Sequence, residues 1–125
     1  MILESYKTKP GRGAALLDYD LDGDMDIIIN CIDESPQLLE NKTKTGNWLT
    51  VLLQGTSADL YGVRVVARKG DRTWSRIIDG GSSYLSQSTS KLYFGFGIVS
   101  EIDSLTIYRH DGEPIIIHSP KLNQI

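Results

Sequence analysis

The sequence predicts an all-β protein: a β-sandwich of about six strands preceded by an N-terminal calcium-binding strand–loop–strand. Three observations support this prediction. Short apolar runs recur along the chain, glycine-rich turns separate them, and no segment shows a sustained helical period. With 125 residues, of which 40% are hydrophobic and 23% charged, the chain is long enough to bury a core.

The first predicted strands flank an acidic stretch near the start of the chain. Residues 13–17 and 27–30 are short apolar runs on either side of it, and residues 36–41 indicate a further short strand. Six later runs have the composition of strands: 48–53, 62–68, 73–78, 92–96, 105–108 and 114–118. Between the last two, Asp111-Gly112 is typical of a hairpin turn. Several short strands at this spacing indicate a sandwich or a barrel.

A polar stretch, residues 42–47, separates the acidic region from the later strands. Its composition indicates a turn or a linker. The acidic strand–loop–strand occurs once, and the later strands contain no second copy of it. We therefore divide the chain into two parts, residues 1–46 and residues 47–125.

The acidic residues gather at one end of the chain. Residues 1–40 hold nine acidic and three basic residues, whereas the remainder holds seven acidic and ten basic residues. These bases are too few and too scattered to indicate nucleic-acid binding. Membrane insertion is not expected either, because no apolar run approaches the roughly 18 to 20 residues that span a bilayer.

The acidic stretch has the pattern of a calcium-binding loop. Its five aspartates stand at alternate positions: Asp18, Asp20, Asp22, Asp24 and Asp26. Calcium prefers six to eight oxygen ligands from a loop that curls around the ion, and alternate residues share the inside of such a curl. Gly23 permits the sharp turn. We expect Asp24 to offer its backbone carbonyl, and Asp26 to complete the shell directly or through a water.

Other interpretations of the acidic stretch are weaker. An EF-hand is rejected because Ile29 stands where its bidentate glutamate would be, and because the flanks are strands. A solvated acidic turn would leave the carboxylates repelling one another with nothing to offset them. Magnesium favours fewer protein ligands, and zinc lacks its histidine and cysteine ligands here. A catalytic role for the aspartates would need a companion base that the sequence does not supply.

Few other residues suggest chemistry, and we predict no catalytic residue. The single cysteine, Cys31, follows an apolar strand and is interpreted as a buried structural thiol. His110 and His118 stand in a turn and at a strand end, which gives no support for a serine–histidine–aspartate triad. Asp79–Gln87 is a distinctive polar loop, interpreted as an ordered connection in preference to a binding surface.

Two segments resemble known families. Residues 13–29 resemble the FG-GAP or VCBS repeat, the calcium-binding blade unit of integrin-type β-propellers. The rest of the chain is similar to the ASPIC/UnbV domain of the cartilage acidic protein-like family. The residues that carry this second resemblance are Asn47-Trp48-Leu49, Gly62-Val63-Arg64-Val65, Gly80-Gly81-Ser82-Ser83-Tyr84-Leu85-Ser86-Gln87 and Leu92-Tyr93-Phe94-Gly95-Phe96-Gly97.

The resemblance implies a location and a general role. It implies a large, secreted or surface-exposed parent whose last propeller blade ends in this chain, or a periplasmic parent in a bacterium. It also implies calcium at the five aspartates and no established enzymatic activity. We therefore expect an adhesion or binding module for an unidentified protein or carbohydrate ligand. The alternatives are a structural cap on the parent propeller, self-association through exposed strand edges and, less favoured, a carbohydrate-active enzyme using Asp79, Asp103 and Asp111.

Overall fold

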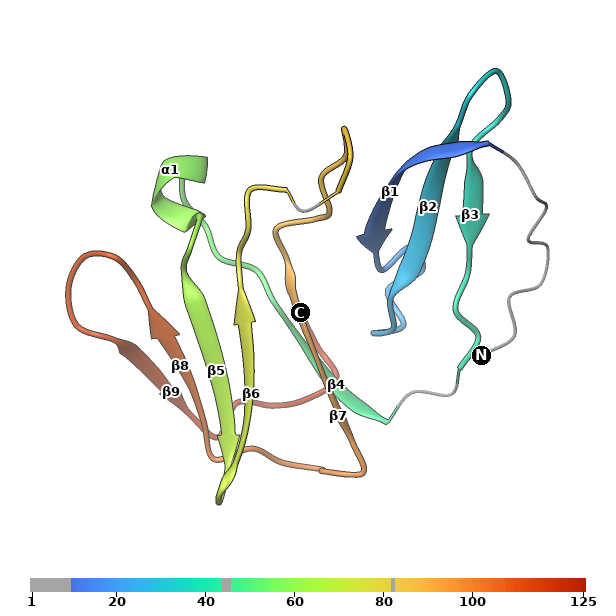
Figure 1. The fold of residues 1–125 in the computed structure, drawn as a ribbon. Helices are drawn as coiled ribbons and strands as arrows, with labels where there is room; N and C mark the ends of the chain where they lie inside the picture. The colour runs from blue at the N-terminus through green and yellow to red at the C-terminus, as the bar shows by residue number, and fades with distance from the viewer. Residues whose placement is uncertain (1–9, 44–45, 82) are drawn as a thin grey trace. The chain divides into compact units, whose positions relative to one another are not determined.

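The protein is mostly β in a computed structural model that describes residues 10–43, 46–81 and 83–125. The described residues form nine strands, arranged in three antiparallel sheets, and one short helix (Figure 1). The strands are β1 (Gly11–Leu17), β2 (Asp26–Cys31), β3 (Gln37–Leu39), β4 (Asn47–Val51), β5 (Arg64–Lys69), β6 (Arg72–Ile77), β7 (Leu92–Gly97), β8 (Ser104–Tyr108) and β9 (Ile115–His118). Every strand that the sequence predicts is present, with bounds shifted by a few residues.

One element departs from the all-β prediction. Residues Ser57–Leu60 form α1, a single helical turn. Thr56 and Asp59 form its capping box, in which each side chain bonds the backbone N–H of the other residue. This pairing satisfies N–H groups that a helix start leaves without partners. At four residues, this helix, the only one in the described part of the chain, is too short to cross a membrane.

The chain forms two compact units. The first, called unit 1, contains the described residues up to 43 together with Gly80–Thr89. The second, called unit 2, contains the described residues 46–79 and 90–125. Residues 1–9 of the predicted first part, and residues 44–45 beside the predicted boundary, lie outside the described residues.

Unit 1 is a three-stranded sheet in the order β1-β2-β3. The pairing of β1 with β2 runs to Leu17 and Asp26, so the two strands end together where the acidic loop begins and finishes. On the other side of β2, Ile28 pairs with Leu38. The sheet therefore holds both ends of the acidic loop at adjacent positions.

Unit 2 contains a two-stranded sheet, β4-β7, and a four-stranded sheet, β6-β5-β8-β9. The two sheets share one core of eleven buried hydrophobic side chains, among them Leu49, Phe94, Val65 and Leu105. The alternation predicted for β5 is present: Val65 and Ala67 are buried, and Arg64 and Arg68 are exposed. This pattern of period two puts one face of the four-stranded sheet on the core and the other in water.

A late segment of the chain completes the two-stranded sheet. The backbone N–H of Thr50 donates to the carbonyl of Gln124 at 3.0 Å, and the N–H of Asn123 donates to the carbonyl of Trp48. The Asn123 side chain also accepts a hydrogen bond from the N–H of Trp48 at 3.0 Å. These bonds cover the edge of β4 that faces away from β7.

Candidate metal centre

The acidic loop connects β1 to β2 and turns sharply at two residues. Leu21 has φ of 63° and Gly23 has φ of 91°, both in the left-handed region. Glycine adopts this conformation freely, whereas leucine does so at a cost of about 1 to 2 kcal/mol. The sequence predicted the turn at Gly23 and gave no sign of the one at Leu21.

Three of the five predicted ligands come together in the loop. One carboxylate oxygen from each of Asp18, Asp20 and Asp22 lies within 4.8 Å of the others. Asp18 is buried, and Asp20 and Asp22 are exposed. This is the one group of its kind found in the described part of the chain, and its oxygens could hold a metal ion. Carboxylate oxygens are the ligands that calcium and magnesium prefer in proteins.

Asp24 lies outside that group, and its side chain is deeply buried. It is 4% exposed, and neither of its carboxylate oxygens has a hydrogen-bond partner. One oxygen of Asp18, Oδ1, is likewise buried and unpaired. Buried carboxylates are normally hydrogen-bonded or paired with a positive charge. A cation in the loop would supply the positive charge that these oxygens lack.

Asp26 closes the loop through hydrogen bonds. Its Oδ2 accepts the backbone N–H of Tyr19 at 2.8 Å, and its Oδ1 accepts that of Asn41 at 2.8 Å. The side chain is 1% exposed, so both bonds are shielded from water. Asp26 thus ties the start of the loop and the chain after β3 to the first residue of β2. Its predicted role as a ligand stays a prediction.

The clustering of carboxylates makes two of them weaker acids. Burial, followed by the neighbouring charges of Asp22 and Asp26, raises the pKa of Asp24 to about 6. Burial also raises the pKa of Asp18, although a hydrogen bond from the Gly23 N–H acts in the opposite direction. Both shifts show that negative charge is disfavoured in the loop when no cation is present.

The donor set fits calcium. The group is made of oxygens alone, in a loop with a sharp turn, which matches the ligand preference of a hard dication. The unpaired buried oxygens of Asp18 and Asp24 argue against a merely solvated acidic turn, because water would satisfy carboxylates that only served solubility. No histidine or cysteine belongs to the group, so the chemistry of a zinc site is absent from it.

Unit 1 also includes a segment that sequence reasoning did not connect with the acidic loop. Residues Gly80–Thr89, which include the distinctive serine-rich motif, lie along β1. The N–H of Leu16 donates to Ser88 Oγ at 3.1 Å, and the N–H of Thr89 donates to the carbonyl of Leu16 at 3.5 Å. We call Gly80–Thr89 the β1-covering segment; Ser82 within it lies outside the described residues.

Gly13 allows this close approach. A Cβ atom at Gly13 would lie 2.0 Å from Ser86 Oγ and 3.0 Å from the Tyr84 carbonyl oxygen, so a larger residue would force the segment away. The segment bonds Leu16, two residues before Asp18. The β1-covering segment therefore holds the strand that leads into the metal loop.

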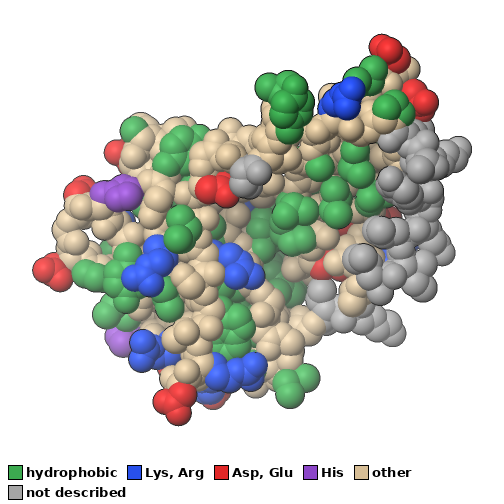
Figure 2. Space-filling view, viewed as in Figure 1, with side chains coloured by type: hydrophobic (Ala, Val, Ile, Leu, Met, Phe, Trp, Pro, Cys, Tyr) green, Lys and Arg blue, Asp and Glu red, His purple; other side chains and the backbone are tan. Residues whose placement is uncertain are grey.

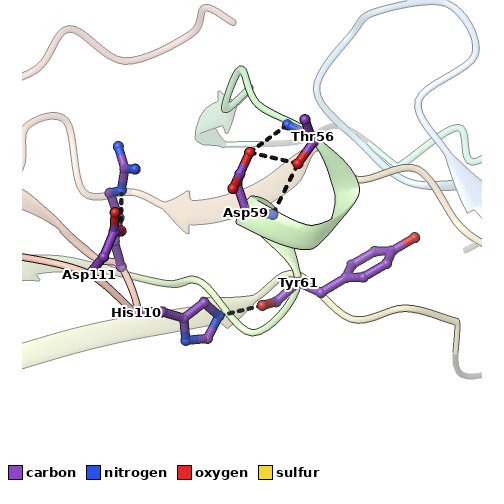
Figure 3. Close-up of polar contacts among 6 residues, drawn as sticks. Thr56, Asp59, Tyr61, His110 and Asp111 are labelled. Atoms are coloured by element: carbon purple, nitrogen blue, oxygen red, sulfur yellow. Dashed lines mark hydrogen bonds and ion pairs between the residues drawn. The ribbon is translucent and has the colours of Figure 1, made fainter.

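The other residues considered from sequence serve turns and strands. His110 Nε2 lies 2.5 Å from the Tyr61 carbonyl oxygen beside α1 (Figure 3). Asp111 pairs with Arg109 at 3.3 Å in the β8–β9 turn. Asp103 accepts hydrogen bonds from the Gly70 N–H and from Lys69, which lower its pKa. Each of these contacts links turns or loops of unit 2.

Three more expectations concern individual side chains. Cys31 is buried at the end of β2, as predicted for a structural thiol. Trp48 and Trp74 lie in strands β4 and β6, where Trp74 meets Phe96 edge to face at 5.1 Å. Tyr84, in the β1-covering segment, is exposed.

The fold and the loop define a β-rich protein with an acidic, metal-competent strand–loop–strand. Sequence comparison identifies its family: residues 54–125 match the family described as ASPIC and UnbV. The chain belongs to this family. The ASPIC/UnbV part of the predicted resemblance is therefore confirmed.

Relatives of known name match over most of the chain. Cartilage acidic protein 1 of Xenopus tropicalis is 37% identical over 109 residues, which cover 82% of this chain and 17% of that protein. The mouse protein of the same name is 31% identical over 123 residues, covering 92% of this chain and 19% of the relative. The human protein is 32% identical over 111 residues, covering 84% and 17%. The chain thus spans less than a fifth of these relatives' length.

Proposed function

We propose that this chain is a calcium-stabilised, non-enzymatic binding or adhesion module of a larger extracellular protein. The observation that carries the proposal is the acidic loop, in which three carboxylates converge and two buried ones have oxygens without a partner. Calcium is present at millimolar levels outside cells, and extracellular modules bind it with dissociation constants of about 0.1 to 1 mM. The name of the relatives places those proteins in cartilage, which fits an extracellular location.

Calcium would act on the fold. The ion offsets the repulsion among Asp18, Asp20 and Asp22 and supplies the charge that the buried Asp24 lacks. With a dissociation constant of about 0.1 mM, millimolar calcium stabilises the folded state by roughly 1.4 kcal/mol. That gain is a large fraction of the stability of a small unit.

The choice of a binding module over an enzyme rests on the other acidic residues. A carbohydrate-active enzyme needs paired carboxylates in a cleft. The candidates outside the metal loop are Asp79, Asp103 and Asp111, and the last two are engaged with basic side chains in turns. The ligand that we propose for the module is a protein or a carbohydrate.

A second candidate function is a structural cap on a β-propeller of the parent protein, with unit 1 as part of an FG-GAP/VCBS-like blade and unit 2 as a β-sandwich. The observation that favours it is the apolar surface of unit 1. Ile28 and Leu38 are paired across β2 and β3, and both are more than a third exposed. A cap would bury these side chains against a neighbouring blade.

The first experiment is a thermal melt in 1 mM calcium and in excess chelator. We expect calcium to raise the midpoint, and Asp20→Asn with Asp22→Asn to abolish the rise. The matched control is Asp71→Asn with Asp79→Asn, which removes the same charge from exposed positions in unit 2. Failure of calcium to raise the wild-type midpoint would contradict the proposal.

A second variant tests the buried carboxylate. Asp24→Asn keeps the shape of the side chain and removes its charge. We expect a higher midpoint in chelator, because an unpaired buried charge has been removed, and a smaller increase on adding calcium. An unchanged calcium response would show that the Asp24 side chain takes no part, and would leave its backbone carbonyl as the predicted ligand.

A further inference from the structure

The sheet edges of unit 2 differ in how they are protected from other strands. An edge strand exposes unpaired N–H and C=O groups, and proteins guard such edges with charged residues or by covering them. The edge of β4 is covered by the segment that contains Asn123 and Gln124. The four-stranded sheet has two further edges, β6 and β9.

Arginines guard the β6 edge. Arg72 and Arg76 both belong to this strand, and basic side chains gather at the surface over β5 and β6 (Figure 2). Arg76 Nε donates to the Tyr93 carbonyl oxygen of β7 at 3.0 Å, and its guanidinium lies 5.7 Å from the centre of the Phe94 ring. A second copy of β6 brought against this edge would meet like charges.

The β9 edge has neither form of protection. All four of its residues are exposed, and three of them are the isoleucines Ile115, Ile116 and Ile117. It pairs only with β8 among the described residues, in a continuous register without a bulge. Hydrophobic side chains reach the surface on the side of unit 2 that carries β9 (Figures 1 and 2).

The sequence of β9 is complementary to itself. In an antiparallel pair related by a two-fold axis through Ile116, residue 116 faces its own copy. Ile115 then faces Ile117 of the other copy. Paired residues share a face of the sheet, and Ile115 and Ile117 already lie on the same face, opposite to that of Ile116. This register places an isoleucine opposite every isoleucine and brings no charged side chain into the strand pair.

We propose that β9 is the surface through which two copies of this chain associate, by antiparallel pairing centred on Ile116. The four-stranded sheets of the two copies then join into one sheet across a two-fold axis. This inference goes beyond the proposed function, because it concerns unit 2 and does not depend on the metal centre. Four residues on each side bury less surface than the roughly 800 Å² per partner of a stable complex, so association is weak.

The experiment measures self-association of the 125-residue chain by sedimentation velocity from about 10 to 500 µM, in calcium throughout. We expect a reversible monomer–dimer equilibrium with a dissociation constant on the order of 100 µM. Ile116→Lys and Ile116→Glu should each weaken dimerisation about tenfold or more, because each places like charges opposite one another. Circular dichroism checks that each variant folds.

Mixing the two variants gives the sharpest test. Lysine and glutamate at position 116 face one another only in a register centred on that residue, so an equimolar mixture should form a heterodimer that neither variant forms alone. The matched control is Ile77→Lys on β6, which lies on the same outer face and is 56% exposed against 54% for Ile116. This control should dimerise like the wild type.

Several results would overturn the proposal. A wild-type chain that stays monomeric over the whole range has no such contact. A dimer that survives both Ile116 variants places the contact elsewhere, for example on unit 1. A mixture that stays monomeric, or an Ile77→Lys variant as impaired as Ile116→Lys, excludes the symmetric register.

Discussion

Units 1 and 2 bury different kinds of side chain. In unit 2, eleven buried hydrophobic residues from both sheets form one core. In the described part of unit 1, the buried hydrophobic side chains are Cys31 and Leu39 alone, beside three buried aspartates. The residues that unit 1 removes from water are thus mostly acids at one end of its sheet.

This difference indicates what each unit needs in order to fold. Burial of apolar surface contributes about 25 cal/mol per Å², and unit 2 draws on it throughout its core. Unit 1 has little apolar burial and must also accommodate charge that it partly excludes from water. A cation in the loop and the β1-covering segment are the two features that we expect to compensate. The predictions below separate these contributions, beginning with the largest.

Phe94→Ala should cause the largest loss. The side chain is 1% exposed and stacks on Phe96 with ring centres 6.2 Å apart. We expect unfolding in urea to show a loss of about 3 to 5 kcal/mol that added calcium does not restore. Ile98→Ala is the control, because Ile98 is almost fully exposed and should change stability by less than about 0.5 kcal/mol. A full rescue by calcium would mean that the units do not differ as described.

Gly13→Ala should weaken unit 1 through the β1-covering segment. The new methyl group would overlap Ser86 Oγ, and we expect a loss of about 1 to 3 kcal/mol. Hydrogen exchange should become faster at residues 84–89. Gly95→Ala is the matched control, because a Cβ atom there meets nothing within 4 Å. Adding Ser86→Ala to Gly13→Ala should recover part of the loss; no loss from Gly13→Ala would show that the segment adapts without cost.

Leu21→Asn should stabilise unit 1. Asparagine tolerates the left-handed conformation, and the Leu21 side chain is exposed, so little packing is lost. We expect a gain of about 1 kcal/mol in chelator, measured by thermal melting. Leu52→Asn, at an exposed leucine without positive φ, should give no gain. An equal gain from both variants would refute backbone strain as the cause.

Asp103 should give the smallest effect, in the acid range. Hydrogen bonds from Gly70 and Lys69 lower its pKa below the ordinary value of 3.8. Its contribution to stability is therefore present above that value and is lost as the pH falls through the lower, folded-state pKa. Melts from pH 2 to 6 should show that Asp103→Asn is less stable than the wild type near neutrality and that the difference shrinks below about pH 4. A difference that stayed constant with pH would contradict this assignment.

Much of the secondary structure follows from local sequence. Alternation in residues 63–67 and the apolar runs around the acidic loop report burial directly, because a strand exposes alternate side chains to opposite faces. The Asp111-Gly112 turn appears as expected, with Gly112 at φ of 93°. The convergence of Asp18, Asp20 and Asp22 was predictable for the same reason, since alternate residues share the inside of a curled loop.

Other features depend on contacts that no local pattern reveals. The α1 turn could have been found from the Thr56-x-x-Asp59 spacing, a variant of the usual capping signal. The β1-covering segment could not, because its partner is a strand some seventy residues earlier, at Leu16. The same holds for Asp24: its side chain is unpaired because of what surrounds it in the folded loop, and spacing alone gives no sign of this.

The pairing of Trp48 with Asn123 has a consequence for how the protein is made. These residues are 75 positions apart, yet their hydrogen bonds complete one small sheet. Contacts between residues so distant in sequence slow folding, because a long stretch of chain must be ordered before they form. During synthesis, β4 emerges from the ribosome well before the segment that covers its edge. For that interval the nascent chain carries an open strand edge, which makes it a natural client for a chaperone.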